Sequence, residues 1–177
     1  PERYENLPEI VDSLLKNTVK PTKIIVSVPK KYLLFNHNYC HISKIKEILK
    51  TYITNNTLEI NEVENGYGPA TKYTGIINYV EKNNLIHKEN FGVIILDDDL
   101  LYNNNIIQEY LKKYIEKPRS ILTLYHMSNK GIKANHDLGS SLIIKGADSI
   151  FLPKYFFIQN NNPSLEETLK NAIKDYE

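Results

Sequence analysis

The sequence has 177 residues, 41% hydrophobic and 24% charged, and this length and balance indicate one globular domain rather than a linker or a tail. With 22 basic and 21 acidic side chains, the net charge of +1 leaves no basic surplus for a nucleic-acid partner. No apolar stretch approaches the roughly 20 residues that span a bilayer, and the first residues lack a signal-peptide pattern. The one cysteine, Cys40, excludes an internal disulfide and fits a reducing, cytoplasmic setting.

The composition is biased toward residues that A+T-rich codons supply. There are 21 Asn and 23 Ile, and 20 of the 22 basic residues are Lys. Such a bias suits an A+T-rich genome, for example that of a large DNA virus. Individual Asn and Lys residues are therefore weak evidence for function, and the two arginines, Arg3 and Arg119, are stronger evidence.

The first part of the chain alternates helix and strand patterns. Apolar residues at helical spacing predict a helix from Tyr4 to Asn17, and a β-branched run predicts a strand from Ile24 to Val28 that ends at Pro29. A helix is then expected from Ile42 to Thr54 and a strand from Leu58 to Val63. Because a helix comes first, we expect that the first strand of an α/β fold is missing and that this single domain, residues 1–177, is trimmed at both ends.

The alternation continues in the second part. The remaining predicted elements are a helix from Ala70 to Val80, a strand from Val93 to Leu96, a helix from Asn103 to Ile115, strands over Ile121–Leu124, Leu142–Lys145 and Ser149–Leu152, and a helix that begins at Ser164. This order predicts an α/β fold with a mostly parallel central sheet and helices on both faces. Ligands of such sheets bind at the carboxyl ends of the strands.

Three consecutive aspartates, Asp97, Asp98 and Asp99, follow the most hydrophobic predicted strand. A chance triple has odds of about 1 in 100 at this Asp content, which is the false-positive risk that the motif must beat. Adjacent carboxylates at the end of a buried strand repel one another unless a cation or solvent offsets their charge. Mg²⁺ or Mn²⁺ suits such oxygen ligands and bridges carboxylates to a diphosphate. The alternative is a solvated acidic turn that caps the next helix.

A second motif lies between a predicted strand and a predicted helix. Gly66 and Gly68 permit close approach of the backbone to a ligand, and Lys72 stands near the start of the helix. A helix N-terminus with a nearby lysine is typical of an anion-binding site. The segment is neither a Walker loop nor a dinucleotide fingerprint. The alternative is a glycine turn with a surface lysine.

Five motifs occur in an order that is similar to a known family. They are Pro-x-Arg before a helix (Pro1–Arg3), Ser-Leu-Leu at its end (Ser13–Leu15), Pro-x-x-Ile-x-x-Ser-x-Pro (Pro21–Pro29), Gly-Pro-Ala-Thr-Lys (Gly68–Lys72) and strand-Asp-Asp-Asp (Asp97–Asp99). Together they resemble glycosyltransferases of the GT-A fold, in the broad family-2-like group. The resemblance covers about residues 1–155, and it implies a Rossmann-like three-layer sandwich.

The resemblance also implies roles for individual residues. Asp99 would be the principal metal ligand, with Asp97 as a further ligand, and Asp97 and Asp98 would bind the ribose or water ligands of the metal. Lys72 and Arg3 would line the nucleotide pocket. The donor would be a nucleoside-diphosphate sugar, most simply a UDP-sugar, the cofactor Mn²⁺ or Mg²⁺, and the acceptor a glycan or a protein.

An inverting enzyme of this family also needs a carboxylate base to deprotonate the acceptor. No convincing acidic motif for that role precedes Glu177. We therefore expect the base beyond Glu177, with Asp148 as a weak candidate inside the chain.

Other interpretations stay open. A phosphatase of the haloacid dehalogenase type also uses strand-Asp-x-Asp, although Leu101 stands where it would have a small hydroxyl residue, and a non-catalytic module that binds nucleotide sugars needs no base. His37, Cys40 and His41 are candidate zinc ligands without a fourth partner, and His126 and His136 are candidates for approaching the metal from a later loop.

Overall fold

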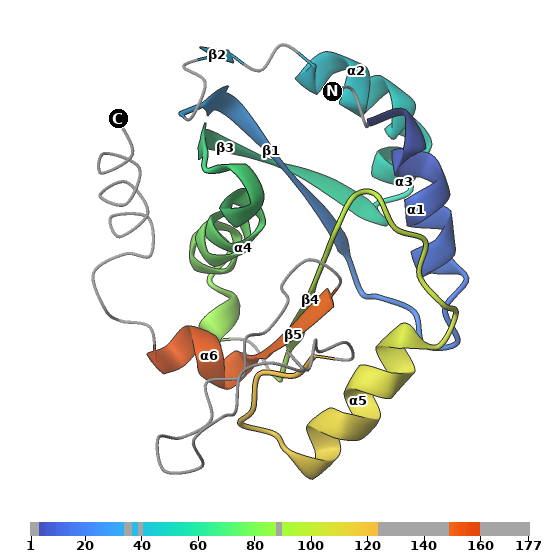
Figure 1. Cartoon of the computed structure of the whole chain (residues 1–177), viewed down its shortest axis with the longest axis vertical. Coiled ribbons are helices and arrows are strands. Elements are labelled where there is room, and N and C mark those ends of the chain that lie inside the picture. Colours follow the sequence, from blue (N-terminus) through green and yellow to red (C-terminus); the bar gives the residue numbers. More distant parts are fainter. Residues whose placement is uncertain (1–3, 34–36, 39–40, 88–89, 124–148, 160–177) are drawn as a thin grey trace, which may run out of the picture.

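A computed structural model describes residues 4–33, 37–38, 41–87, 90–123 and 149–159 of the chain (Figure 1). These residues form a three-stranded sheet of order β2-β1-β3 and a two-stranded sheet of β4 and β5. The strands are β1 (Ile24–Tyr32), β2 (His37–Asn38), β3 (Leu58–Gly66), β4 (Gly92–Leu96) and β5 (Ser149–Pro153). The class is mixed α/β, as predicted.

Most helices that the apolar periodicity predicted in the described part of the chain are present. They are η1 (Tyr4–Asn6), α1 (Leu7–Leu15), α2 (Ile42–Ile48), α3 (Lys50–Thr54), η2 (Gly68–Ala70), α4 (Thr71–Lys82), η3 (Leu85–His87), α5 (Ile106–Glu116) and α6 (Lys154–Gln159). The helix expected from Ile42 to Thr54 is divided at Leu49 into α2 and α3. The short helix α6 was not predicted.

β1 and β3 are parallel, with register from Ile24 opposite Leu58 to Tyr32 opposite Gly66. β1 therefore continues past Pro29, where the sequence predicted its end. Proline is tolerated at an open edge because its missing N–H then breaks no ladder bond. β2 pairs with β1 only at Lys31 and Tyr32, so in the described part of the chain no strand lies beside Pro29 on that edge.

The expected single, mostly parallel sheet is not present among the described residues. β4 pairs with β5 in the antiparallel sense, from Gly92 opposite Pro153 to Leu96 opposite Ser149, and these residues do not pair with β1. The strand expected at Ile121 is reduced to a bridge between Leu122 and Phe151. The other late elements that the sequence predicts, at residues 142–145 and from 164 onward, lie outside the described residues.

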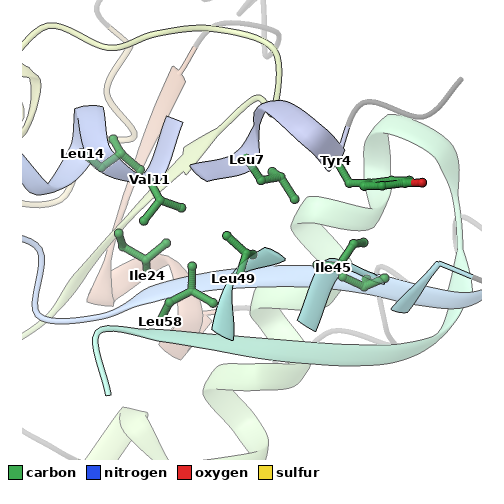
Figure 2. Packing of buried hydrophobic residues seen from close by; sticks show 9 residues of the cluster. Tyr4, Leu7, Val11, Leu14, Ile24, Ile45, Leu49 and Leu58 are labelled. Carbon is green, nitrogen blue, oxygen red and sulfur yellow. The ribbon is translucent and has the colours of Figure 1, made fainter. Parts of the chain in front are cut away.

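One face of the three-stranded sheet packs against α1, α2 and α3. The members of this first core cluster are Tyr4, Leu7, Val11, Leu14, Ile24, Val28, Ile45, Leu49 and Leu58 (Figure 2). The residues from α1 recur at three- and four-residue intervals, which places them on one side of the helix. Leu49, at the α2–α3 junction, is fully buried. Its burial keeps the chain against the core at the point where α2 ends and α3 begins.

The other face of the same sheet packs against α4, which lies across it from α1 (Figure 1). Asn61 on β3 is buried, and its Nδ2 donates to the Gly75 carbonyl of α4 at 2.8 Å. A Cβ at Gly75 would lie 2.7 Å from the Cβ of Ser27 on β1. The absence of a side chain at Gly75 therefore permits the close approach of α4 to the sheet.

Replacing Gly75 with alanine should consequently lower the free energy of unfolding. Alanine favours a helix by about 0.5–1 kcal/mol over glycine, but overpacking against Ser27 costs about 1–3 kcal/mol, so the net effect is a loss. Urea denaturation measures it, and Asn78→Ala, at an exposed position of the same helix, serves as the control. A Gly75→Ala protein as stable as the wild type would contradict this packing.

α4 also covers the second sheet. Its residues Ile76 and Val80 pack with Ile95 of β4 in a second core cluster, completed by Ile150, Leu152 and Phe157. A third cluster, Ile106, Tyr110, Leu122 and Phe151, joins α5 to β5. The two sheets are thus held together through α4, which packs against both.

A fully buried asparagine ties α1 to α5. Asn17 donates from Nδ2 to the Ser13 carbonyl at 3.2 Å and accepts at Oδ1 from the backbone N–H of Ile107 at 3.2 Å. Thr18 donates from its backbone N–H to the Asn104 carbonyl at 2.7 Å. These bonds hold the segment between β4 and α5 against the end of α1.

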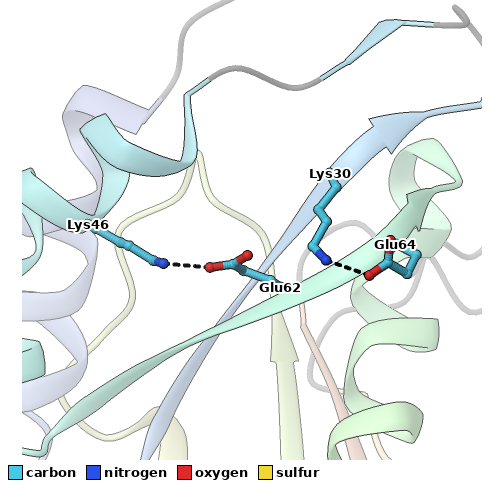
Figure 3. Close-up of polar contacts among 4 residues, drawn as sticks. All are labelled: Lys30, Lys46, Glu62 and Glu64. Atoms are coloured by element: carbon cyan, nitrogen blue, oxygen red, sulfur yellow. Dashed lines mark hydrogen bonds and ion pairs between the residues drawn. The ribbon is translucent and has the colours of Figure 1, made fainter.

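The surface of β3 carries two ion pairs (Figure 3). Lys30 Nζ lies 2.5 Å from Glu64 Oε1, and Lys46 Nζ lies 2.5 Å from Glu62 Oε1. The hydrogen bond from Lys46 lowers the pKa of Glu62. Exposed pairs of this kind contribute little to stability, but charged side chains disfavour pairing of an edge strand with another molecule.

Within the described ranges, no helix combines the length and the apolarity needed to cross a membrane.

Candidate functional site

The three aspartates form a turn directly after β4, named here the acidic turn (Asp97–Asp99). The Asp97 side chain is only 22% exposed, whereas Asp98 and Asp99 are exposed. The turn thus presents one partly buried carboxylate and two that face solvent.

Tyr102 holds the start of this turn. Its hydroxyl accepts a hydrogen bond from the backbone N–H of Asp97 at 2.8 Å and donates one to the Asp97 carbonyl at 3.0 Å. The backbone N–H of Tyr102 donates to Ser13 Oγ at 3.4 Å, and its ring packs against the first and third core clusters. The position of Asp97 is therefore coupled to α1 and to the core.

Tyr102→Phe should remove both hydroxyl bonds while keeping the ring. We expect the free energy of unfolding to fall by about 1–3 kcal/mol, because two partly buried backbone groups of Asp97 lose their partner. Guanidinium denaturation checks this value. Tyr114→Phe is the matched control, since the Tyr114 ring packs on Phe151, and it should stay within about 0.5 kcal/mol of the wild type. Equal losses in the two variants would show that the Tyr102 hydroxyl does not hold the turn.

The second motif forms the connection from β3 to α4. Gly68 adopts a φ of 59°, which favours glycine. The backbone N–H of Tyr67 donates to Thr71 Oγ1 at 2.8 Å, and this bond starts α4 beside the end of the strand. Lys72 follows in the first turn of the helix.

Lys72 and Asp97 form an ion pair, in which Lys72 Nζ donates to Asp97 Oδ1. The two side chains are 21% and 22% exposed, so the pair is partly shielded from solvent. The contact joins the Gly-Pro-Ala-Thr-Lys motif to the acidic turn.

Two tyrosines complete the surroundings. Burial and the negative charge of Asp98 raise the pKa of Tyr32, and burial and the charge of Asp97 raise the pKa of Tyr73. Both phenols therefore stay neutral well above neutral pH, with their rings near the carboxylates. Lys72 Nζ also lies 5.7 Å from the centroid of the Tyr73 ring.

Close packing of β1 against β3 sets the position of Tyr32. It pairs with Gly66 at the end of the β1–β3 ladder. A Cβ at Gly66 would lie 2.9 Å from the Cβ of Pro29 and 3.0 Å from the Tyr32 ring, so a larger residue would push the strand ends apart. The carboxyl ends of β1 and β3 therefore lie side by side, and the ion pair places Asp97, directly after β4, beside the first turn of α4.

The acidic turn offers carboxylate oxygens that could bind a divalent cation. Among the described residues, no group of three or more His, Cys, Asp or Glu side chains is arranged to hold a metal ion. The donor chemistry nevertheless fits, because carboxylate oxygens are the ligands that Mg²⁺ and Mn²⁺ prefer. In this structure the Lys72 ammonium group occupies the position beside Asp97 that a metal cation would take.

Several predicted site residues lie outside the described residues, namely Arg3, Cys40, His126, His136 and Asp148. Of the candidate zinc ligands, His41 stacks on Tyr4 with ring centroids 5.3 Å apart. His41 thus packs beside η1 at the start of α2.

A separate depression of about 740 Å³ lies between α2, α3 and the first half of β3. Its lining includes Lys46, Lys50, Ile53 and Leu58. It contains no residue of the acidic turn and no part of the β3–α4 connection, so we assign it no role in the chemistry of the site.

Comparison with known proteins identifies no relative: no family model, no curated protein and no solved structure matches the chain. The residues of the site are therefore the basis for assigning a function. These are a lysine at a helix start, a partly buried aspartate beside it, two exposed aspartates and two tyrosines.

Proposed function

We propose that the chain is a metal-dependent glycosyltransferase domain of the GT-A type, which moves a sugar from a nucleoside-diphosphate sugar, a UDP-sugar first of all, to a glycan or protein acceptor. The observation that carries this proposal is the ion pair between Lys72 and Asp97. It unites the two motifs on which the resemblance depends, and these motifs follow the carboxyl ends of β3 and β4.

The GT-A fold is part of the proposal. The parallel β1–β3 pair, with α1 to α3 on one face and α4 on the other, agrees with a three-layer arrangement. We propose that β4 belongs to the same mostly parallel layer as β1, since α4 packs against both sheets.

The proposal gives each site residue a role. Asp97 and Asp99 would hold Mn²⁺ or Mg²⁺, which when bound offsets the charge of the departing nucleoside diphosphate. Lys72 and Arg3 would bind the phosphates, and Asp98 would bind the ribose or a water ligand of the metal. Tyr32 and Tyr73 would exclude water from one side of the carboxylates.

The reaction breaks the bond between the anomeric carbon of the sugar and the diphosphate oxygen, and the electron pair leaves with the nucleoside diphosphate. The acceptor hydroxyl oxygen forms the new bond to that carbon. Its proton passes to a carboxylate base if the reaction inverts the configuration. The ammonium group of Lys72 stabilises the negative charge that develops on the leaving group.

Donor hydrolysis tests this function. The chain is incubated with UDP-sugars and GDP-sugars in Mn²⁺, and release of free nucleoside diphosphate is measured by chromatography. Release that chelation of the metal abolishes supports a glycosyltransferase. Donor binding without release, with or without acceptor, favours a non-catalytic module. Phosphate release from a generic phosphoester, lost in Asp97→Asn, would favour the phosphatase instead.

A further inference from the structure

Lys72 occupies one oxygen of the carboxylate that the proposed function assigns to the metal. Asp97 is the least exposed member of the acidic turn. The Tyr102 hydroxyl holds its backbone through hydrogen bonds to both the N–H and the carbonyl of Asp97. The backbone of Asp97 therefore cannot shift away from the lysine without breaking these bonds, and only rotation of its short side chain is left. Lys72, on a flexible four-carbon stem in the first turn of α4, is the mobile partner.

Two cations beside one carboxylate repel each other. At a partly shielded site a unit charge at ion-pair distance interacts far more strongly than in bulk water, so an ammonium group on Asp97 weakens the attraction for a divalent ion. A diphosphate changes this balance, because its negative charge attracts the ammonium group and offers it another partner.

We infer that Lys72 and the divalent cation compete for Asp97. The diphosphate of the nucleotide ends this competition, because it attracts the Lys72 ammonium group away from Asp97. This inference rests on the proposed function. The consequence is positive coupling: the ion binds weakly to the nucleotide-free protein, and the nucleotide and the ion each strengthen binding of the other by the same factor. Lys72 thereby prevents unproductive binding of the metal without donor.

Calorimetric titration of Mn²⁺, with and without saturating UDP, tests the inference on the wild type and on Lys72→Met, which keeps the length of the stem. Lys72→Met should bind Mn²⁺ alone at least about tenfold more tightly than the wild type, because the competing charge is gone. The same variant should bind UDP more weakly in Mn²⁺, and the factor by which UDP strengthens Mn²⁺ binding should decrease.

Three further variants support the comparison. Lys72→Gln is a second neutral variant, and thermal melting shows whether each variant is folded and whether Mn²⁺ stabilises it more than it stabilises the wild type. Lys72→Met combined with Asp97→Asn should lose the gain in Mn²⁺ affinity. Lys112→Met, which removes an exposed lysine paired with Glu109 on α5, should behave as the wild type.

The outcomes separate this inference from the proposed function. If the wild type binds UDP in Mn²⁺ but neither neutral variant binds Mn²⁺ more tightly, the competition is overturned and the proposed function stands. If the variants gain Mn²⁺ affinity but no protein binds a nucleoside diphosphate, the coupling and the proposed function both fail, and the competition at Asp97 alone is upheld.

Discussion

Replacing Phe151 with alanine should lower the free energy of unfolding by about 3–5 kcal/mol, the largest stability effect that we expect of a single substitution. Phe151 is 3% exposed on β5. Its ring packs against Tyr110, with centroids 5.8 Å apart, and against Tyr114, at 5.2 Å. Gly92 on β4 leaves room for the same ring, because a Cβ there would collide with it. A truncated side chain would leave a cavity between β4, β5 and α5.

Urea denaturation followed by circular dichroism measures this loss. Ile158→Ala is the control, since that side chain is 47% exposed on α6 and its truncation should cost less than about 1 kcal/mol. Similar losses in the two variants would mean that β5 does not hold the third core cluster together. Phe151→Leu should lie between them, because it retains part of the buried volume.

Replacing Asp99 with asparagine should weaken Mn²⁺-dependent binding of UDP by about 100-fold or more, since even outer-shell partners of a metal contribute 10–100-fold to its affinity. The substitution removes one negative charge and keeps the shape. Asp99 is exposed, so its loss should leave the fold intact. Asp97→Asn is a less specific test, because it also takes the ion-pair partner from Lys72.

Glu116→Gln, at an exposed position at the end of α5, is the matched control for charge, and its UDP affinity should equal that of the wild type. The thermal melting temperatures of both variants should agree with the wild type in the absence of ligand. An Asp99→Asn protein that binds UDP normally in Mn²⁺ would remove this residue from the proposed metal site.

The sequence predicted most helices because a helix with one buried face repeats its apolar residues at 3.6-residue spacing, as Leu7, Val11 and Leu14 do. It predicted where β4 ends, since the change from apolar to acidic residues is abrupt. It did not predict strand partners, because periodicity shows that a segment is extended but not what lies beside it. The antiparallel pairing of β4 with β5, and the extension of β1 past Pro29, depend on such tertiary contacts.

The candidate site was also predicted only in part, because the sequence does not show which residues become neighbours in the fold. The motif residues Lys72 and Asp97 were named in advance, and the ion pair brings them together. Tyr102 was missed because its hydroxyl contacts backbone atoms of Asp97, which leave no pattern in the sequence. Tyr32 and Tyr73 were not predicted as site residues, and only their nearness to Asp98 and Asp97 in the folded chain sets them apart. The position of Tyr73 next to Lys72 was the one available signal.

Calorimetric titration of UDP into the wild-type protein, once in Mn²⁺ and once in chelator, tests the central claim most directly. The claim is that the acidic turn and Lys72 together form a metal-dependent site for a nucleoside diphosphate. We predict saturable binding in Mn²⁺ that is lost in chelator. Absence of binding to UDP and also to GDP in Mn²⁺, by a protein that melts cooperatively, would contradict it and leave Asp97–Asp99 as a solvated turn before α5.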